Sequence, residues 1–597
     1  MLLAAVMAGL LLWLLVPFFL RQDGSPVGAD TAVYVWWMRL AGHDGLSAIG
    51  SRPGVPAVSL VLAGVTGASA VTTTAAIACV LVVVAASSGA ALSRAGGATG
   101  DVSAVAAALT GIFATYLAAG HLSNVTFAAL FLAGLACTFG RARPRGMVAA
   151  IALVGAAGLS HPDFLVAAIA IMVIAAMLAW VAHERKEAMT LIGVTAGGVA
   201  LAGLGLATTV TGGPAFDVDT SRDVFLIRVG QLPLLRQLYL DRLVPKASGY
   251  ALWAWLPLAA VGLTRRCGQL GRLLIAWCAV LAIGVVVGIA RQPFPPHRVI
   301  AFGFCLPILA ALGLEAIAVR LWRTGPLIVI AMIVVVAASA TVTWMHAPRP
   351  FDAPVAASIP QDTVLWSASP TGTPVIVDLP TRGPGAVAAV LRAANLVRAE
   401  VPPEWIRDVL VRFPRPATAD PEAYALWVDT ESQVQRAVAS ASAAPREIRI
   451  DGATTSAVPL APGASVVAAT TDGGPQTTTP LAIAAVALVS LLVLGLAGAG
   501  WAQAAGVTGI GVAERAPAMG VAALILTAVV VDRLGVRITR PVAITLAILL
   551  SAAGYLVAAI GRRGSRSPGT RRSIPRGAGT TDLAPGRHPS LDTPSTT

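Results

Sequence analysis

The chain has 597 residues, of which 56% are hydrophobic and only 12% charged, and its mean hydropathy is +0.78. Soluble globular proteins carry about 25% charged residues, so this composition excludes an ordinary soluble enzyme. The formal net charge of +13 comes from 42 Lys and Arg against 29 Asp and Glu. No basic face interleaved with aromatic residues points to nucleic acid, and the charge is instead typical of membrane topology and of contact with lipid headgroups.

Apolar runs recur along the chain, and each is long enough to cross a hydrocarbon core of about 30 Å. The first run lacks a basic segment before it, so we expect an anchoring helix that is not cleaved. Residues 55–68 are expected to form a re-entrant or interfacial segment, because together with the next run they are too long for one helix. The spans are predicted near residues 1–20, 71–92, 102–119, 123–140, 147–160, 163–182, 189–210, 250–264, 273–290, 299–319, 326–345, 480–501, 516–532 and 541–560. This pattern predicts an all-α polytopic membrane protein with about 12 to 14 transmembrane helices.

The distribution of arginine predicts the orientation of these spans. Cytoplasmic connections of membrane proteins carry an excess of Lys and Arg, and a cytoplasmic N-terminus places the basic connections near residues 94, 141–145, 185–186, 265–272, 320–323 and 515 on that side. The connection 532–540 departs from the rule, since it holds Arg533, Arg537 and Arg540 on the expected outer side. The few lysines and the abundance of alanine, glycine and valine suggest a high-GC bacterium. We therefore expect a multi-pass protein of the plasma (inner) membrane with both termini cytoplasmic and an active face outside.

Four regions follow from this topology. Residues 1–345 form a transmembrane module with outer loops 21–54 and 211–249, and residues 480–560 form further transmembrane helices. Residues 346–479 are expected to fold as a small extracytoplasmic α/β domain, with strands in TPVIVDLP (373–380) and EIRIDG (447–452). Residues 561–597, rich in Arg, Ser, Pro, Gly and Thr, are expected to be a disordered basic cytoplasmic tail.

The first outer loop contains the leading candidate for a catalytic residue. Asp30 directly precedes TAVYVWWMRLA, an aromatic-rich segment suited to an interfacial helix. A carboxylate in this position is a natural N-cap. It can also be held ionised at the positive helix end and directed at a substrate. Both readings stay open, and they are compatible with each other.

Two further outer turns carry histidine and arginine. LSHPDF places His161 and Asp163 at a helix-to-helix turn, where a cap explains the aspartate more easily than the histidine. RQPFPPHR places Arg291, His297 and Arg298 at one junction, where guanidinium groups and a helix start suit a phosphate. The alternative for the arginines is contact with lipid headgroups.

No cofactor is predicted with certainty. The segment FDVDTSRDVF contains Asp217, Asp219 and Asp223, which have the spacing of oxygen ligands. These aspartates either bind a divalent cation or belong to a solvated turn. The five cysteines show no metal-ligand spacing. Whether the protein holds a metal is therefore left open.

The layout of the chain resembles the GT-C class of membrane glycosyltransferases. It shares with that class a first helix, a long outer loop with a carboxylate at an interfacial helix, many spans with outer His and Arg turns, and a later outer domain. The layout is similar to that of polyprenyl-phosphate-sugar-dependent mannosyl- and arabinosyltransferases, over roughly residues 1–345. The resemblance implies that Asp30 is the catalytic carboxylate and that His161 and Arg298 contact donor phosphate or sugar. Many members carry two adjacent acidic residues in that loop, whereas Thr31 follows Asp30 here.

The function implied is transfer of a sugar from a polyprenyl-phosphate carrier to an extracytoplasmic envelope glycan, lipid or protein, with membrane lipids as partners and no nucleic acid. Asp163, Arg291 and His297 join the residues expected to bind the donor. Two alternatives remain. One is a transporter or flippase of lipid-linked saccharide, and the other is a noncatalytic membrane scaffold for envelope assembly.

Overall fold

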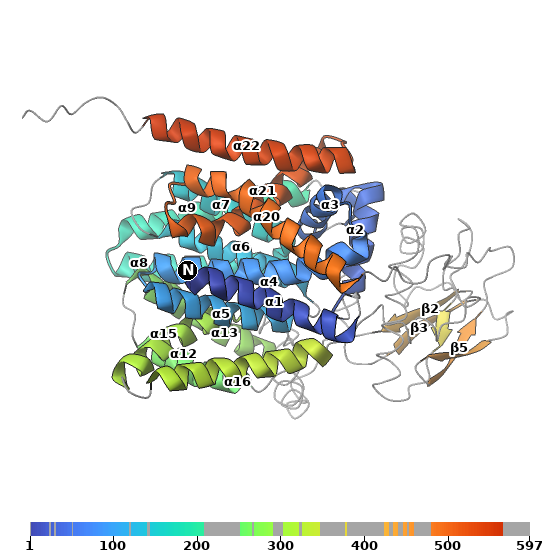
Figure 1. Cartoon of the computed structure of the whole chain (residues 1–597), viewed down its shortest axis with the longest axis horizontal. Coiled ribbons are helices and arrows are strands. Elements are labelled where there is room, and N and C mark those ends of the chain that lie inside the picture. The colour runs from blue at the N-terminus through green and yellow to red at the C-terminus, as the bar shows by residue number, and fades with distance from the viewer. Residues whose placement is uncertain are drawn as a thin grey trace, which may run out of the picture.

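The computed structural model shows a long bundle of helices with a group of strands beyond one end (Figure 1). It describes residues 2–22, 26–28, 31–49, 52–118, 121–139, 144–207, 251–264, 268–290, 302–321, 325–346 and 479–564, together with the strands within 376–458. The predictions that concern residues 211–249 and the tail after residue 564 lie outside this part of the chain.

Each predicted apolar run corresponds to a helix, with ends shifted by a few residues. Within the described residues, eight helices are long and apolar enough to cross a membrane, namely α1, α4, α5, α8, α9, α20, α21 and α22. The chain is thus an all-helical polytopic membrane protein in its main body, while the expected total number of spans remains a prediction. The helices are α1 Leu2–Arg21, α2 Thr31–Asp44, η1 Leu46–Ile49, α3 Gly54–Thr66, α4 Ala70–Ala95, α5 Gly100–Ala118, α6 Leu122–Thr138, α7 Pro144–Ser160, α8 Pro162–Val181, α9 Arg185–Ala207, α12 Ala251–Leu263, α13 Gln269–Ala290, α15 Cys305–Arg320, α16 Gly325–His346, α20 Pro480–Ala504, α21 Ile510–Arg533 and α22 Arg540–Gly564.

The bundle has two ends that differ in what they carry. At one end, which we call the His161 end, lie α2 and α3 (Figure 1). The short helix η1 contacts α2 there, and Ser160, at the turn between α7 and α8, packs against Gly54 of α3. At the other, the Glu514 end, Arg94 near the end of α4 meets Glu514 near the start of α21. From α4 to α9, each helix is joined to the next by a short connection, so consecutive helices run in opposite directions between these ends.

Helix α3 stays at the His161 end. Its first residue, Gly54, packs against Ser160 at the end of α7, and the glycine that follows it, Gly67, packs against Arg540 at the start of α22. A Cβ at Gly54 would come within 2.8 Å of the Cα of Ser160, so this approach needs glycine. With 13 residues, α3 is about 20 Å long and too short to cross a hydrocarbon core. The structure agrees with the expectation that this segment does not span.

The turn between α21 and α22 also lies at the His161 end. Asp532 accepts hydrogen bonds from the backbone amides of Leu46 (2.8 Å to Oδ1) and Ser47 (3.2 Å to Oδ2), and thereby binds the first turn of η1 from a distant part of the sequence. Arg537 lies against Gly45, which has a φ of +93°. Asp532 and Arg537 thus contact the segment that follows α2. A contact within the protein explains why this turn carries arginine, although the other basic turns lie at the opposite end of the bundle.

Helices α20 and α21 approach each other through glycine. A Cβ at Gly498 would collide with the carbonyl oxygen of Ala516 and lie 2.5 Å from the backbone nitrogen of Gly520. Small residues of this kind allow two backbones to pack closely inside a membrane.

Gly498→Val is expected to lower the free energy of unfolding by about 1–3 kcal/mol, because the two backbones must separate to admit the side chain. Thermal unfolding in detergent, followed by intrinsic fluorescence, measures the change. Gly495→Val is the matched control on the same helix, because nothing lies within 4 Å of a Cβ at Gly495. Equal melting temperatures for the two variants would contradict the close approach.

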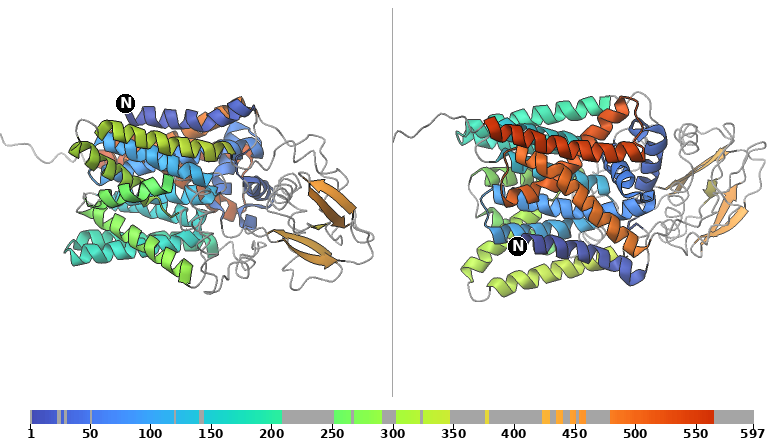
Figure 2. Two further views of the ribbon diagram at one scale, coloured as in Figure 1. Left: turned by 90° about the horizontal axis from the view of Figure 1, so that it is seen from below. Right: turned by 45° about the horizontal axis from the view of Figure 1, so that its top comes forward.

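The described part of 346–479 consists of five strands, which lie beyond the His161 end (Figures 1 and 2). β1 Ile376–Asp378, β5 Ala453–Val458 and β4 Arg446–Ile450 form a sheet in that order, and β2 Ala423–Val428 pairs with β3 Val434–Ala439; all pairs are antiparallel. β1 lies within the predicted strand 373–380, and β4 overlaps the predicted strand 447–452. Between them, GPGAVAAVLRAANLVRAEV (383–401) predicts a turn and a helix, which lie outside the described residues, so the α/β domain remains a prediction.

Candidate functional site

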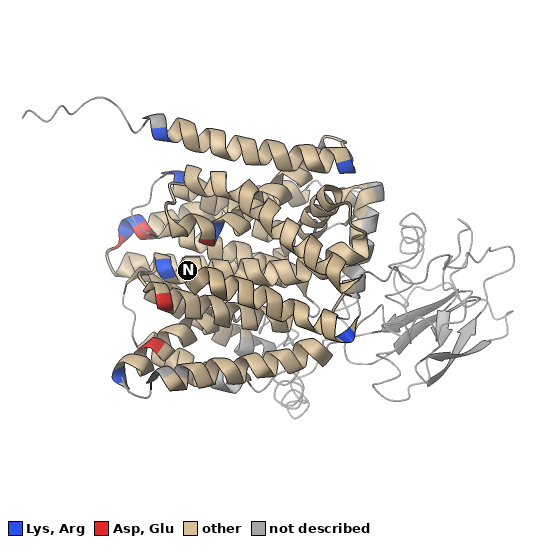
Figure 3. Ribbon diagram, viewed as in Figure 1, with Lys and Arg blue, Asp and Glu red and all other residues tan. Residues whose placement is uncertain are grey.

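Among the described residues, Lys, Arg, Asp and Glu lie mainly near the ends of the helices, and the stretches between the ends carry few of them (Figure 3). Transport through a bilayer commonly uses ionisable residues or interrupted helices near the midplane. The arrangement directs the search for chemistry to an end of the bundle.

His161 is buried at the turn between α7 and α8. The residue is 1% exposed, and its ring stacks on Phe164 with centroids 4.0 Å apart and planes inclined by 15°. Phe164 in turn contacts Phe127 of α6 and Phe302 edge-on, at 5.6 and 5.1 Å between centroids. This aromatic packing holds the imidazole in one orientation at the His161 end.

Asp163 lies beside the imidazole and forms an ion pair with Arg52. Its Oδ2 is 4.0 Å from Nδ1 of His161 and 3.2 Å from a terminal nitrogen of Arg52. The side chains of Asp163 and Arg52 are 42% and 22% exposed, so the pair is open to solvent while His161 is not. The turn therefore presents a carboxylate and a guanidinium next to a buried imidazole.

Arg52 was not among the residues predicted from the sequence. The sequence did contain a signal for Arg52. It lies in SRPG, in the loop that was predicted to face outward, where the distribution of basic residues does not require an arginine. Only the fold brings it to Asp163, which is 111 residues away in the chain.

Helix α2 is fixed to the same part of the bundle. The hydroxyl of Tyr34 accepts a hydrogen bond from the backbone amide of Ser123, in the first turn of α6, at 3.0 Å, and its oxygen lies 3.3 Å from Oγ of Ser123. At the start of α2, the amide and the hydroxyl of Thr31 donate to the carbonyl oxygen of Gly28 at 3.1 and 2.5 Å. Phe127, which packs against Phe164, lies one turn after Ser123, so α6 connects the start of α2 to the aromatic cluster around His161.

The structure describes some of the predicted site residues and not others. His161 and Asp163 lie side by side at the His161 end. Asp30, Arg291, His297 and Arg298 lie outside the described residues, although Thr31 and Phe302, close to them in sequence, are described and lie at this end. Within the described residues, no group of three His, Cys, Asp or Glu could hold a metal ion, and the aspartates 217, 219 and 223 are not among them.

Comparison with known proteins gives limited further information. No family model matches the chain, and no curated protein matches it. Among solved structures, it is similar to the Archaeoglobus fulgidus oligosaccharyltransferase in complex with Zn and sulfate, with a TM-score of 0.39 and 14% identity over 59% of this chain. The match spans 54% of that chain. A likeness at this TM-score does not establish a shared fold or activity.

Tyr34→Phe is expected to lower the free energy of unfolding by about 1–3 kcal/mol, because the buried amide of Ser123 loses its acceptor. The measurement is thermal unfolding of the purified protein in detergent. Tyr555→Phe is the control, since Tyr555 is 41% exposed on α22. If both substitutions had the same effect, the tether between α2 and α6 would have no energetic importance.

Arg52→Gln and Asp163→Asn are each expected to change the free energy of unfolding by less than about 1 kcal/mol, because exposed ion pairs contribute little. Chemical denaturation in detergent would detect a larger loss. A large destabilisation by either substitution would show that the ion pair stabilises the fold. If the effect is small, the same variants can be used to test the function of the pair.

Proposed function

We propose that the chain is a membrane glycosyltransferase that moves a sugar from a polyprenyl-phosphate carrier to an extracytoplasmic glycan, lipid or protein at the His161 end. The main support is that two neighbouring residues of α6 hold the two parts of the site. Ser123 is hydrogen-bonded to Tyr34 near the start of α2, and Phe127 packs on Phe164, on which the buried His161 stacks. A carboxylate at the start of an interfacial helix and an imidazole beside an ion pair form a suitable set for group transfer at the membrane surface.

The proposed reaction is a single displacement. The oxygen of an acceptor hydroxyl attacks the anomeric carbon of the sugar, and Asp30 accepts its proton as general base. The bond between the anomeric carbon and the phosphate oxygen breaks with inversion, and polyprenyl phosphate leaves with the bonding electrons. Arg298 stabilises the negative charge that develops on this phosphate.

The remaining predicted residues are proposed to bind the donor. Arg291 and His297 flank the phosphate together with Arg298, as fixed cationic and hydrogen-bonding groups. His161 and Asp163 orient the sugar or the phosphate from the turn between α7 and α8. Arg52 acts as a positioning residue, because it binds Asp163 and orients its carboxylate. Metal dependence is left to experiment.

One alternative is a transporter or flippase of lipid-linked saccharide. The scarcity of charged residues between the ends of the described helices favours an activity at the membrane surface over a path through the bundle (Figure 3). A second alternative is a noncatalytic scaffold whose functional part is 346–479.

The deciding experiment uses the full chain in proteoliposomes with a radiolabelled polyprenyl-phosphate sugar. For a transferase, label appears in a washed acceptor fraction in proportion to the amount of protein. Movement of intact labelled lipid between leaflets, without sugar transfer, would replace the proposal by the transporter. If neither occurs with any donor and acceptor supplied from the host membrane, and deletion of 346–479 alone abolishes envelope assembly, the scaffold would be the correct function.

A further inference from the structure

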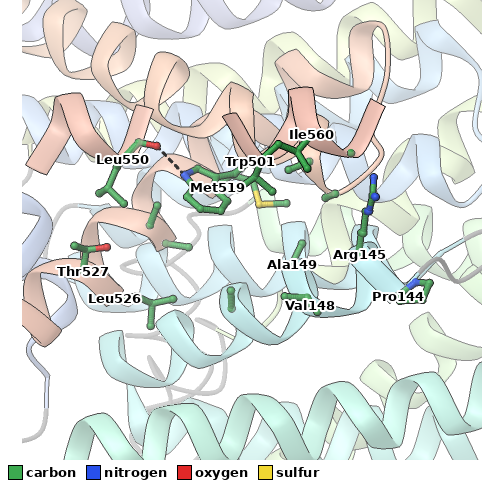
Figure 4. A pocket seen from close by; sticks show the side chains of 17 residues that line it. Pro144, Arg145, Val148, Ala149, Trp501, Met519, Leu526, Thr527, Leu550 and Ile560 are labelled. Carbon is green, nitrogen blue, oxygen red and sulfur yellow. Dashed lines mark hydrogen bonds between the residues drawn. The ribbon is translucent and has the colours of Figure 1, made fainter. Parts of the chain in front are cut away.

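A second feature of the bundle lies between α7 and the C-terminal helices. Helices α7, α20, α21 and α22 enclose an open cavity of about 880 Å³ (Figure 4). Ligand sites in proteins commonly measure about 300–1,000 Å³. Its wall includes Val148, Trp501, Met519, Leu526, Leu550 and Ile560. We call it the α7/α22 groove.

The lining of the groove is almost entirely apolar. The indole nitrogen of Trp501 donates to the carbonyl oxygen of Leu550 at 3.1 Å, so its polar group is already engaged. Thr527 provides a hydroxyl at one end of the lining, and Arg145 lies at the opposite end (Figure 4). Among the described residues that form the wall there is no Asp or Glu. The groove therefore suits a molecule with a hydrocarbon chain and an anionic group.

Arg145 forms the cationic end of the groove, and Arg562 follows the lining residue Gly561 in the chain. Arg145 begins α7, and its guanidinium lies against Gly561 near the end of α22. Arg562, the next residue, donates a hydrogen bond to the side-chain oxygen of Gln503 at the end of α20. Among the described residues, no carboxylate forms an ion pair with Arg145. The positive charge of Arg145 is thus not neutralised by a carboxylate among the described residues.

The groove opens to the side of the bundle, and its Arg145 end lies at the Glu514 end. Val148 and Ile560 on its rim are 65% and 61% exposed, which in a membrane protein means contact with lipid. The 17 residues of α7 separate Arg145 from His161 by about 25 Å. The groove is therefore distinct from the candidate site at the other end.

We propose that the α7/α22 groove binds an anionic membrane phospholipid, with an acyl chain against Met519 and Leu550 and the phosphate on Arg145. Basic pockets between transmembrane helices on the cytoplasmic side bind such headgroups, and the predicted orientation places Arg145 on that side. The site does not depend on the reaction proposed for the His161 end. A bound lipid joins α7 to the C-terminal helices α20–α22 and thereby strengthens the contact between two distant parts of the chain.

The test is native mass spectrometry of the purified full chain after incubation with equal amounts of phosphatidylglycerol and phosphatidylcholine. Wild type is expected to retain phosphatidylglycerol selectively. Arg145→Gln is expected to retain about five-fold less, the change expected for the loss of one arginine contact at a membrane surface. Ala523→Trp, which fills the groove and keeps the charge, is expected to lose both lipids from this site.

Arg185→Gln is the matched control, because Arg185 lies at the same end of the bundle, over the ring of Trp180 and away from the groove. It is expected to retain phosphatidylglycerol like wild type. Equal retention by Arg145→Gln, Ala523→Trp and wild type, with all proteins eluting as single species, would overturn the site. Preferential displacement of phosphatidylglycerol by added polyprenyl phosphate would overturn the choice of a diacyl phospholipid as occupant.

Discussion

Replacing Asp30 by asparagine is expected to lower sugar transfer by about 10²–10⁴-fold, the contribution typical of a general base. Asparagine caps a helix as well as aspartate does, so the substitution preserves the start of α2 and removes only the ability to accept a proton. The measurement is the initial rate of transfer by membranes that contain equal amounts of inserted protein, at saturating donor and acceptor.

Asp101→Asn is the matched control for this substitution. Asp101 is an exposed aspartate in the first turn of α5, at the Glu514 end of the bundle, so its replacement tests the loss of a carboxylate at a helix start away from the candidate site. It is expected to leave transfer unchanged. If Asp30→Asn transferred sugar as fast as Asp101→Asn, Asp30 would be only a helix cap, and the general base would have to be sought elsewhere at the His161 end.

Removal of Arg94 is expected to destabilise the bundle strongly. Glu514 is completely buried, and its Oε1 accepts a hydrogen bond from Nε of Arg94 at 2.6 Å, while its Oε2 has no hydrogen-bond partner among the described residues. Arg94→Gln leaves this carboxylate without its cation. The loss of one partner of a buried ion pair costs about 3–5 kcal/mol.

The double variant Arg94→Leu/Glu514→Leu tests whether the loss of stability comes from the unpaired charge of Glu514. Since it removes both charges, it is expected to be much more stable than Arg94→Gln, and similar to wild type. Thermal unfolding in detergent compares the three proteins, with Arg320→Gln as a control for loss of an exposed arginine at the end of α15. Equal destabilisation by the single and double variants would show that Arg94 acts through packing and not through the charge of Glu514.

The sequence predicts that this is a membrane protein and where its helices lie, because an apolar run can be recognised from consecutive residues alone. A run of about 20 apolar residues has to form a helix in a bilayer, where no water is available to bind its backbone groups. The predicted spans 71–92 and 163–182 accordingly correspond to α4 Ala70–Ala95 and α8 Pro162–Val181. Helix α3 could be recognised as unusual for the same reason, because its length conflicts with that of a span.

The candidate site could be predicted only in part. His161 was identified because a short turn between two apolar helices has little need for an imidazole, and Asp163 because it is its neighbour in sequence. Arg52 was not, since its contact with Asp163 joins the first loop to the turn between α7 and α8. A pair of residues 111 positions apart leaves no periodic pattern in the sequence.

The sequence by itself determined the membrane class, the places of the helices and the turns in which His161 and Asp163 lie, because each follows from local hydropathy or from adjacent residues. Only the tertiary structure decided that Asp532 binds the start of η1, that Tyr34 attaches α2 to α6, and that Glu514 is neutralised by Arg94. These contacts join segments 89 to 486 residues apart. They depend on how helices of similar hydropathy pack against one another, and apolar composition alone does not distinguish one such neighbour from another.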